Sequence, residues 1–88
     1  MNKEEIKLIS WIVRGSQRTK ILKAINGMMT PTQIKEITHF GLNNVSDILR
    51  LFVEKGIVKC LNEEEKLGRL YLLTEKGNQL KHYIENKK

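Results

Sequence analysis

The stretch that decides the fold is Thr30–Gly56, TPTQIKEITHFGLNNVSDILRLFVEKG. It predicts two helices joined by a tight turn. The first helix has a clear start, because Thr30 can act as the N-cap, Pro31 fits the first helical position and Gln33 completes a capping box. Two isoleucines at helical spacing would then form its buried face: Ile34 and Ile37.

The second helix follows a turn at Phe40 and Gly41, where glycine can adopt the left-handed conformation that a sharp turn needs. Asn43 is a good N-cap for it. Apolar residues at i, i+3, i+4 and i+7 then form a core-facing stripe: Val45, Ile48, Leu49 and Phe52. The helix ends before Gly56, so two amphipathic helices are expected in tandem.

The polar face of the second helix is the first candidate functional surface. It carries short polar side chains and one arginine: Asn43, Asn44, Ser46, Asp47 and Arg50. Such side chains suit contacts with base edges and phosphates in a DNA major groove. A solvated face of an ordinary amphipathic helix explains the same pattern, so both interpretations stand.

Composition bounds the class of protein. The 88 residues allow one domain, 1–88, with one modest core, and 40% apolar residues are enough to fold it. A net charge of +6 favours an anionic partner such as nucleic acid. One cysteine fits a reducing compartment. The start has no cleavable signal peptide and no apolar run reaches membrane-span length, so we expect a cytoplasmic protein that crosses no membrane.

The remaining segments complete a mixed, mainly helical chain. Helices are expected over residues 2–13 and 17–25, the second capped by Ser16. Met28 and Met29 have the character of a very short strand before Thr30. Two apolar, β-favouring runs, 57–61 and 69–73, form a hairpin around a loop at 62–68. Thr74 can cap a last helix, which extends to about residue 85.

Cations surround the start of the helix over 17–25: Arg14, Arg18 and Lys20. Positive charge disfavours a helix N-terminus, and a bound phosphate would ease that conflict. Arg18 is therefore a candidate phosphate contact. A solvated cationic turn is the alternative.

This order of elements resembles the winged helix-turn-helix domain, and in particular small bacterial and archaeal regulators of the MarR and ArsR kind. The resemblance covers residues 16–77, with additional terminal helices at 2–13 and 75–85. The segments that carry it are TPTQI at 30–34, GLNNVS at 41–46, EKGIV at 54–58, and GRLY at 68–71 with LTEKG at 73–77. It implies an α+β, mainly α, fold with a three-helix core and a two-stranded β wing.

The resemblance also implies a function. The protein would be a sequence-specific regulator of transcription that binds double-stranded DNA, with the recognition helix at 43–55 in the major groove. Thr32 and Gln33 would lie on the helix that braces the DNA backbone. The wing at 62–68 would approach the backbone through Lys66 and Arg69.

Two acidic features depart from that pattern and keep a second function open. Asp47 faces the groove, where it could accept from cytosine N4 or repel phosphate. The wing tip is Glu63–Glu65, three acids in a row. A winged helix used as a protein-interaction module, without strong DNA binding, would explain both.

Other kinds of site find little support in the sequence. Cys60 lies in an expected strand and is interpreted as a structural thiol. The only other soft ligands are His39 and His82, without paired spacing, so we expect no metal site and no cofactor. No nucleophile, base and pocket combine, so we do not expect an enzyme.

The terminal helices predict a homodimer. The N-terminal one offers Ile6, Ile9, Trp11, Ile12 and Val13, and the C-terminal one offers Leu80, Tyr83 and Ile84. The sequence alone makes this apolar surface look surplus to the central core, and such surplus marks an interface. The alternative is that the two helices pack on each other and close the core of a monomer.

Overall fold

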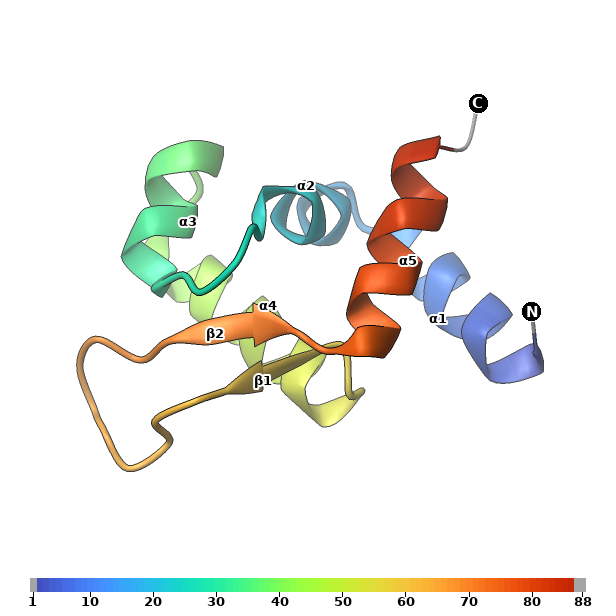
Figure 1. Cartoon of the computed structure of the whole chain (residues 1–88). Helices are drawn as coiled ribbons and strands as arrows, with labels where there is room; N and C mark the ends of the chain where they lie inside the picture. Colours follow the sequence, from blue (N-terminus) through green and yellow to red (C-terminus); the bar gives the residue numbers. More distant parts are fainter. Residues whose placement is uncertain (1, 87–88) are drawn as a thin grey trace.

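The computed structural model describes residues 2–86, which form five helices and one two-stranded antiparallel sheet (Figure 1). The elements in chain order are α1 (Lys3–Val13), α2 (Ser16–Ala24), α3 (Pro31–Thr38), α4 (Leu42–Glu54), β1 (Val58–Cys60), β2 (Tyr71–Leu73) and α5 (Glu75–Asn86). This is the expected mainly helical winged helix with additional helices at both ends. Within residues 2–86, no helix has the length and apolar character needed to cross a bilayer.

The turn between α3 and α4 differs from expectation in its details. The left-handed residue is His39, with φ 65°, whereas Gly41 is extended at φ −62° and is the N-cap of α4. α3 ends at Thr38, three residues before Gly41. The N–H of its C-cap, His39, donates to the carbonyl of Lys35. Asn43 is therefore the second residue of α4 and not its cap.

The buried face of α3 is also smaller than expected. Ile34 is fully buried, but Ile37 is 56% exposed, so the expected pair reduces to one residue. The start of α3 agrees with expectation, since Thr30 and Gln33 form the reciprocal capping box and Pro31 is the first helical residue. At α2 the N-cap is Gly15, and Ser16, the expected cap, is the first helical residue.

The hairpin is shorter than expected, and its loop is longer. β1 pairs with β2 with Lys59 opposite Leu72, so each strand has three residues and the loop spans 61–70. Met29 forms the short strand-like contact that the sequence indicated, exchanging two backbone hydrogen bonds with Tyr71. This bridge ties the segment before α3 to the base of the wing.

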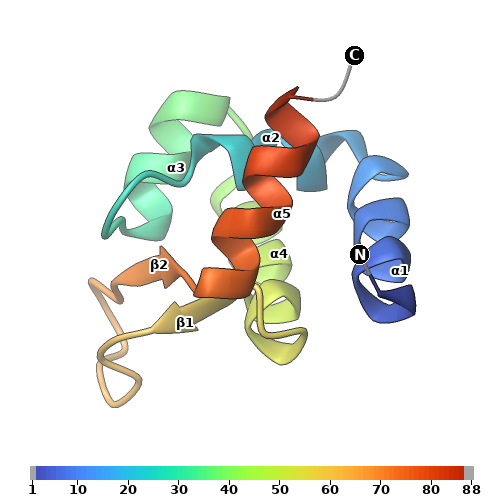
Figure 2. The same cartoon turned by 45° about the vertical axis from the view of Figure 1, so that its right-hand side comes forward.

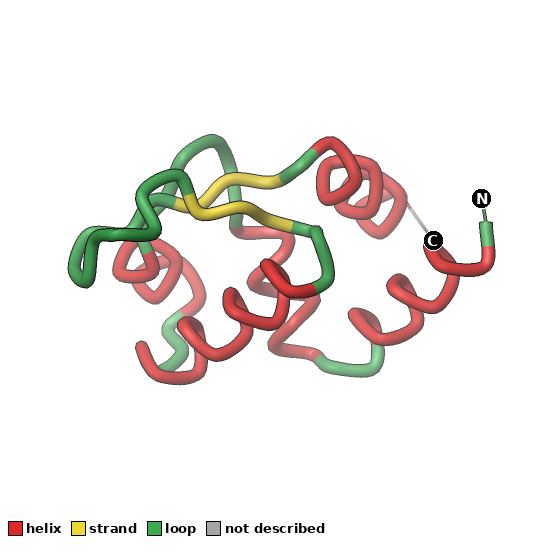
Figure 3. The backbone as a smooth tube through the Cα atoms, turned by 90° about the horizontal axis from the view of Figure 1, so that it is seen from below, coloured by secondary structure: helices red, strands yellow, loops and turns green. Residues whose placement is uncertain are grey.

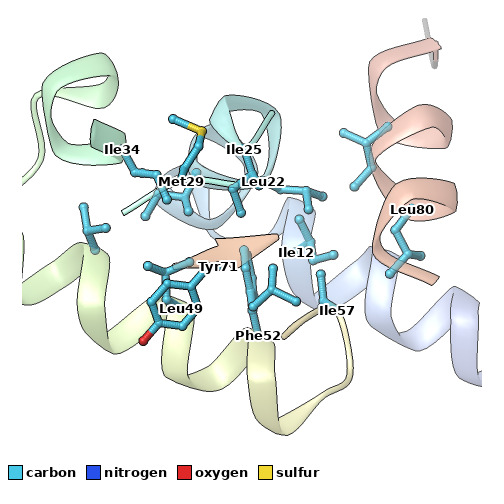
Figure 4. Packing of buried hydrophobic residues seen from close by; sticks show 14 of the residues in the cluster. Ile12, Leu22, Ile25, Met29, Ile34, Leu49, Phe52, Ile57, Tyr71 and Leu80 are labelled. Atoms are coloured by element: carbon cyan, nitrogen blue, oxygen red, sulfur yellow. The ribbon is translucent and has the colours of Figure 1, made fainter. Parts of the chain in front are cut away.

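One hydrophobic cluster unites all five helices (Figure 4). Its side chains from the terminal helices are Ile9, Ile12, Leu80 and Ile84, all at most 7% exposed. The expectation that the central helices and the hairpin supply the core by themselves is therefore wrong. The core includes these residues because α1 packs on α2 and α5, and α5 also packs on α2 and β2.

The start of α5 is fixed by two close contacts. The hydroxyl of Thr74 accepts from the N–H of Gly77, as the cap that the sequence predicted, and donates to the carbonyl of Gly56 at 2.6 Å. Gly77 is buried, and a Cβ there would overlap the carbonyl oxygen of Ile57. Glycine is thus required where α5 crosses the segment that leads into β1.

The wing and α1 lie at opposite ends of the molecule. Seen from below, the hairpin loop extends from one end of the helical body and α1 forms the other (Figure 3). In the rotated view, α5 stands in front of α2 and α4, with α1 to one side and the hairpin to the other (Figure 2). A surface built on the wing is therefore separate from one built on α1.

Candidate nucleic-acid interface

A surface hollow of about 560 Å³ lies between the start of α3, the outer face of α4 and the wing loop. Five of the sequence-predicted residues line it: Thr32, Ser46, Arg50, Lys66 and Arg69. Three separate segments contribute them, so the fold assembles polar and cationic groups that are far apart in the chain. Apolar side chains that the sequence did not single out also line the hollow, among them Leu42, Val53 and Tyr71.

The outer face of α4 presents the other polar residues. Asn43 and Asn44 are exposed in the first turn, which contains no acidic residue. Because the N-cap is Gly41, which makes no side-chain hydrogen bond, neither amide takes the capping position. A first turn with backbone N–H groups and no carboxylate favours an approaching anion.

Arg50 and Asp47 form an ion pair on that face. The two side chains are one helical turn apart, with Arg50 Nη1 3.4 Å from Asp47 Oδ1. They are 70% and 66% exposed, so the pair is solvated and weak. It is the one salt bridge found within residues 2–86.

The two predicted residues on α3 differ in their surroundings. Gln33 is engaged in the capping box, where its Oε1 accepts from the N–H of Thr30 at 2.9 Å. This bond fixes the side chain beside the helix start. Thr32 is exposed and lies on the rim of the hollow.

The wing loop is held together by two side chains. Arg69 donates from Nε to the carbonyl of Glu65 at 2.6 Å and from Nη2 to the carbonyl of Glu63 at 3.1 Å. Asn62 accepts from the N–H of Leu70 and donates to the carbonyl of Gly68. The guanidinium of Arg69 thus has a structural role that the sequence did not reveal, with three of its five N–H groups left for other partners.

The tip of the wing is acidic and partly apolar. Glu63–Glu65 and Lys66 are exposed, and Leu67 is 89% exposed. The sequence indicated the acids, but Leu67 and the bracing by Asn62 were missed. A run of polar residues around Asn62 shows a loop without showing its internal hydrogen bonds.

Arg18 is placed apart from the other predicted residues. Its Nη1 donates to the carbonyl of Trp11 at 2.7 Å, and its guanidinium lies 4.5 Å from the centre of the Trp11 ring. Lys55 lies over the same ring at 4.7 Å, and the ring meets Phe52 edge-on at 5.9 Å. Arg18, at the start of α2, therefore compensates the C-terminus of α1, where unpaired carbonyls attract positive charge.

Charge is distributed unevenly over the chain. Residues 6–30 contain five cations and no acid, whereas residues 31–54 and 61–70 together contain four cations and six acids. The helix pair and the wing loop thus carry less positive charge than the rest. The lining of the hollow has a different balance, with three cations and one acid: Arg50, Lys66, Arg69 and Glu63.

The remaining candidate groups show no reactive arrangement. Cys60 is half-buried, and its Sγ lies 3.7 Å from Asn62 Oδ1, as a weak donor within the wing base. Across residues 2–86, no three potential ligands gather where they could hold a metal ion.

Comparison with solved structures finds the same fold in two proteins. The reduced form of MarR from E. coli superposes with a TM-score of 0.71 at 25% identity, over 92% of this chain and 64% of that chain. TubR bound to 24 bp of tubC, from Bacillus thuringiensis serovar israelensis pBtoxis, superposes with a TM-score of 0.77 at 15% identity, over 100% and 97%. A further TubR structure, from type III plasmid segregation, gives 0.73 at 14% identity.

Comparisons based on sequence give no match, either to a family model or to a curated protein. The chain has a MarR-like winged-helix fold, as its structural neighbours show. It spans 64% of the length of the MarR chain.

Proposed function

We propose that the protein binds double-stranded DNA sequence-specifically and regulates transcription, with α4 in the major groove and the wing loop beside the backbone. The observation that carries this proposal is the hollow between α3, α4 and the wing. It gathers hydroxyl and cationic groups from three segments on one face. The likeness to MarR and TubR supports it, since TubR is bound to DNA in its structure.

The proposed contacts divide by chemistry. Thr32, Lys66 and Arg69 would bind phosphates, with Gln33 holding the start of α3 in position. The outer face of α4 would contact base edges through five side chains: Asn43, Asn44, Ser46, Asp47 and Arg50. We leave Arg18 out of the proposed interface, because it does not line the hollow and its guanidinium packs on Trp11.

Capture of genomic DNA tests the proposal. The protein is incubated with sheared genomic fragments, and the bound DNA is sequenced. A short shared motif is expected. Binding should weaken steeply as the salt concentration rises, because the release of counterions from DNA then gains less free energy. Arg50→Ala should reduce the enrichment of that motif. Its folding should not change, because the Arg50 side chain is exposed. Enrichment without any shared motif would contradict sequence-specific binding.

A second candidate function is supported by the wing tip. A rigidly braced loop that exposes Leu67 beside three acids suits a protein partner better than a phosphate backbone. In that case the protein would be a winged-helix interaction module. A salt titration with random duplex separates the two functions, because a module of this kind should show no useful DNA affinity.

We also propose a homodimer through the terminal helices, although the exposed apolar surface there is smaller than the sequence suggested. It consists of Ile6, Val13 and Tyr83, which are 56%, 44% and 40% exposed. A two-fold dimer would place two recognition helices about 34 Å apart, one turn of DNA.

Sedimentation equilibrium at micromolar concentration tests the dimer. A species near twice 10.3 kDa is expected, and Ile6→Glu should shift it to the monomer without unfolding. Met28→Glu is the control, because Met28 is similarly exposed but lies outside both helices. A single species near 10.3 kDa for the wild type would contradict the dimer.

A further inference from the structure

We propose that Asp47 determines sequence specificity by holding Arg50 for guanine and disfavouring its contact with phosphate. This inference rests on the proposed DNA binding and extends it to the choice of base. It starts from one observation. In residues 2–86 the single ion pair lies on the face of α4 that would meet the bases.

The geometry of the pair leaves Arg50 able to bind DNA. Only Nη1 contacts Asp47, at 3.4 Å, so most of the five N–H donors of the guanidinium stay unused by this contact. Arg50 also lines the hollow, whereas Asp47 lies one turn earlier on the exposed surface. The pair is solvated and weak, so Asp47 biases the orientation of the guanidinium without fixing it. The remaining edge of the guanidinium can still donate two parallel hydrogen bonds.

Asp47 affects the two possible targets of Arg50, guanine and phosphate, to different extents. The major-groove edge of guanine offers two neutral acceptors, O6 and N7, which a guanidinium can bind while it keeps its carboxylate partner. A phosphate brings a second negative charge next to Asp47, and the two anions repel each other. Asp47 therefore opposes contact with phosphate at every sequence and opposes contact with guanine much less. In addition, its carboxylate can accept from N4 of a neighbouring cytosine.

The charge of the surrounding face strengthens this discrimination. Apart from the three cations that line the hollow, the charged residues of the helix pair and the wing loop are mostly acids, which lower the attraction for DNA of arbitrary sequence. Direct base contacts must then supply much of the affinity. A carboxylate in the centre of a recognition helix lowers random binding, and this lowering widens the gap between the correct site and all others.

Glu54 provides a matched control. It lies on the same helix four residues after Arg50, yet it borders a separate hollow with Trp11 and Lys55, on the α1 side. Asp47→Asn and Glu54→Gln remove the same charge with nearly the same shape. They differ in whether the lost carboxylate contacts Arg50.

The experiment is selection from a randomised duplex library with the wild type, Asp47→Asn, Arg50→Lys and Glu54→Gln, followed by sequencing. Thermal unfolding of each variant verifies that it is folded. We expect the wild-type motif to contain a guanine whose preference falls about tenfold in Asp47→Asn and in Arg50→Lys. Asp47→Asn should also bind random duplex several-fold more tightly, whereas Arg50→Lys should not, because lysine keeps the charge and loses the paired donors.

The outcomes distinguish a failure of the proposed role of Asp47 from a failure of the proposed DNA binding. If Asp47→Asn selects the wild-type motif with unchanged sharpness, Asp47 has no part in specificity and the inference fails while DNA binding stands. The inference also fails if Glu54→Gln broadens the motif equally, because charge alone would then explain the effect. If the folded wild type enriches no motif, the proposed function fails and the inference with it.

Discussion

The recognition side of the molecule and the α1–α2 side differ in how they use charge. The proposed recognition side, residues 31–53 and 61–70, contains five acids and four cations, whereas all five charged residues within 6–30 are cations. Yet the cationic side binds part of its charge internally. Arg18 donates to the carbonyl of Trp11, and Arg14 donates from Nε to the carbonyl of Ser10, both near the end of α1.

If DNA binds at the proposed recognition side, net charge is a poor guide to the interface of this protein. The net charge of +6 favours an anionic partner. However, five of the cations lie in the acid-free residues 6–30, which include most of α1 and all of α2. There some of it offsets helix C-termini, where carbonyls lack partners. We propose the recognition side from position instead, because the winged fold presents α4 and the wing together around one hollow.

The largest effect that would sharpen this comparison is on stability. Trp11→Ala should lower the free energy of unfolding by about 3 kcal/mol, because it removes a half-buried aromatic ring and leaves a cavity. The ring contacts Phe52, and it is also the partner of Arg18 and Lys55. Urea unfolding measures this loss, and the DNA preference of the folded fraction should stay the same.

Tyr83→Ala is the control for that measurement. Tyr83 is an aromatic residue on a terminal helix with 40% of its surface exposed, and its loss should cost the monomer much less. Equal losses in the two variants would mean that the cations on Trp11 have no special structural role.

The next effect is on binding and concerns the recognition side alone. Arg50→Ala should weaken binding to the selected DNA site by about 1–3 kcal/mol if Arg50 makes a bidentate base contact. The free energy of unfolding should change by less than about 0.5 kcal/mol, because the side chain is exposed. Fluorescence anisotropy with a labelled duplex measures the first quantity. Normal binding by this variant would remove α4 from the proposed interface.

A smaller effect is expected from the acids of the wing. Replacing Glu63, Glu64 and Glu65 by Gln should strengthen binding to random duplex by on the order of threefold at low salt, since repulsion from the phosphates is lost. The backbone carbonyls that receive Arg69 remain, so the loop should keep its shape. Glu4→Gln, Glu5→Gln and Glu85→Gln, on the terminal helices α1 and α5, together form the charge-matched control. An unchanged affinity in the triple variant would place the wing tip far from DNA.

The sequence predicted the parts of this molecule that depend on local chemistry. The capping box at Thr30 and Gln33, the stripe on α4 and the cap of α5 at Thr74 each follow from residue type and spacing, and the structure confirms them. Register and length were predicted less well. His39 adopts the left-handed conformation in place of Gly41 because it is the C-cap of α3, where its N–H donates to the carbonyl of Lys35. Residue preferences favour glycine for such a position and therefore did not indicate His39.

The residues of the candidate site could be predicted from the sequence, but the hollow that brings them together could not. Polar residues on α4 were evident from periodicity, whereas the hollow depends on where the wing loop folds back. The bracing of that loop by Asn62 and the docking of Arg18 on Trp11 join residues seven or eight positions apart through hydrogen bonds. Neither has a signature in sequence spacing, because each forms only after neighbouring elements have packed.

The smallest expected effect tests the cationic side directly. Lys20 and Lys23 are exposed on α2, in the acid-free segment, and appear in none of the ion pairs described for residues 2–86. If DNA touches only α3, α4 and the wing, Lys20→Gln with Lys23→Gln should change the affinity for the selected site less than about twofold. The dependence of the logarithm of affinity on that of salt concentration should also keep its slope, because no counterion is released at these lysines. A slope that falls by about 0.9 for each lysine would show instead that both bind phosphate. Lys66→Gln, on the wing, is the positive control, with an expected fall of about one phosphate contact. A fall in the double variant that matches or exceeds that of Lys66→Gln would mean that DNA reaches α2. The cationic side would then be part of the interface, and the contrast between the two sides would be one of affinity against selectivity.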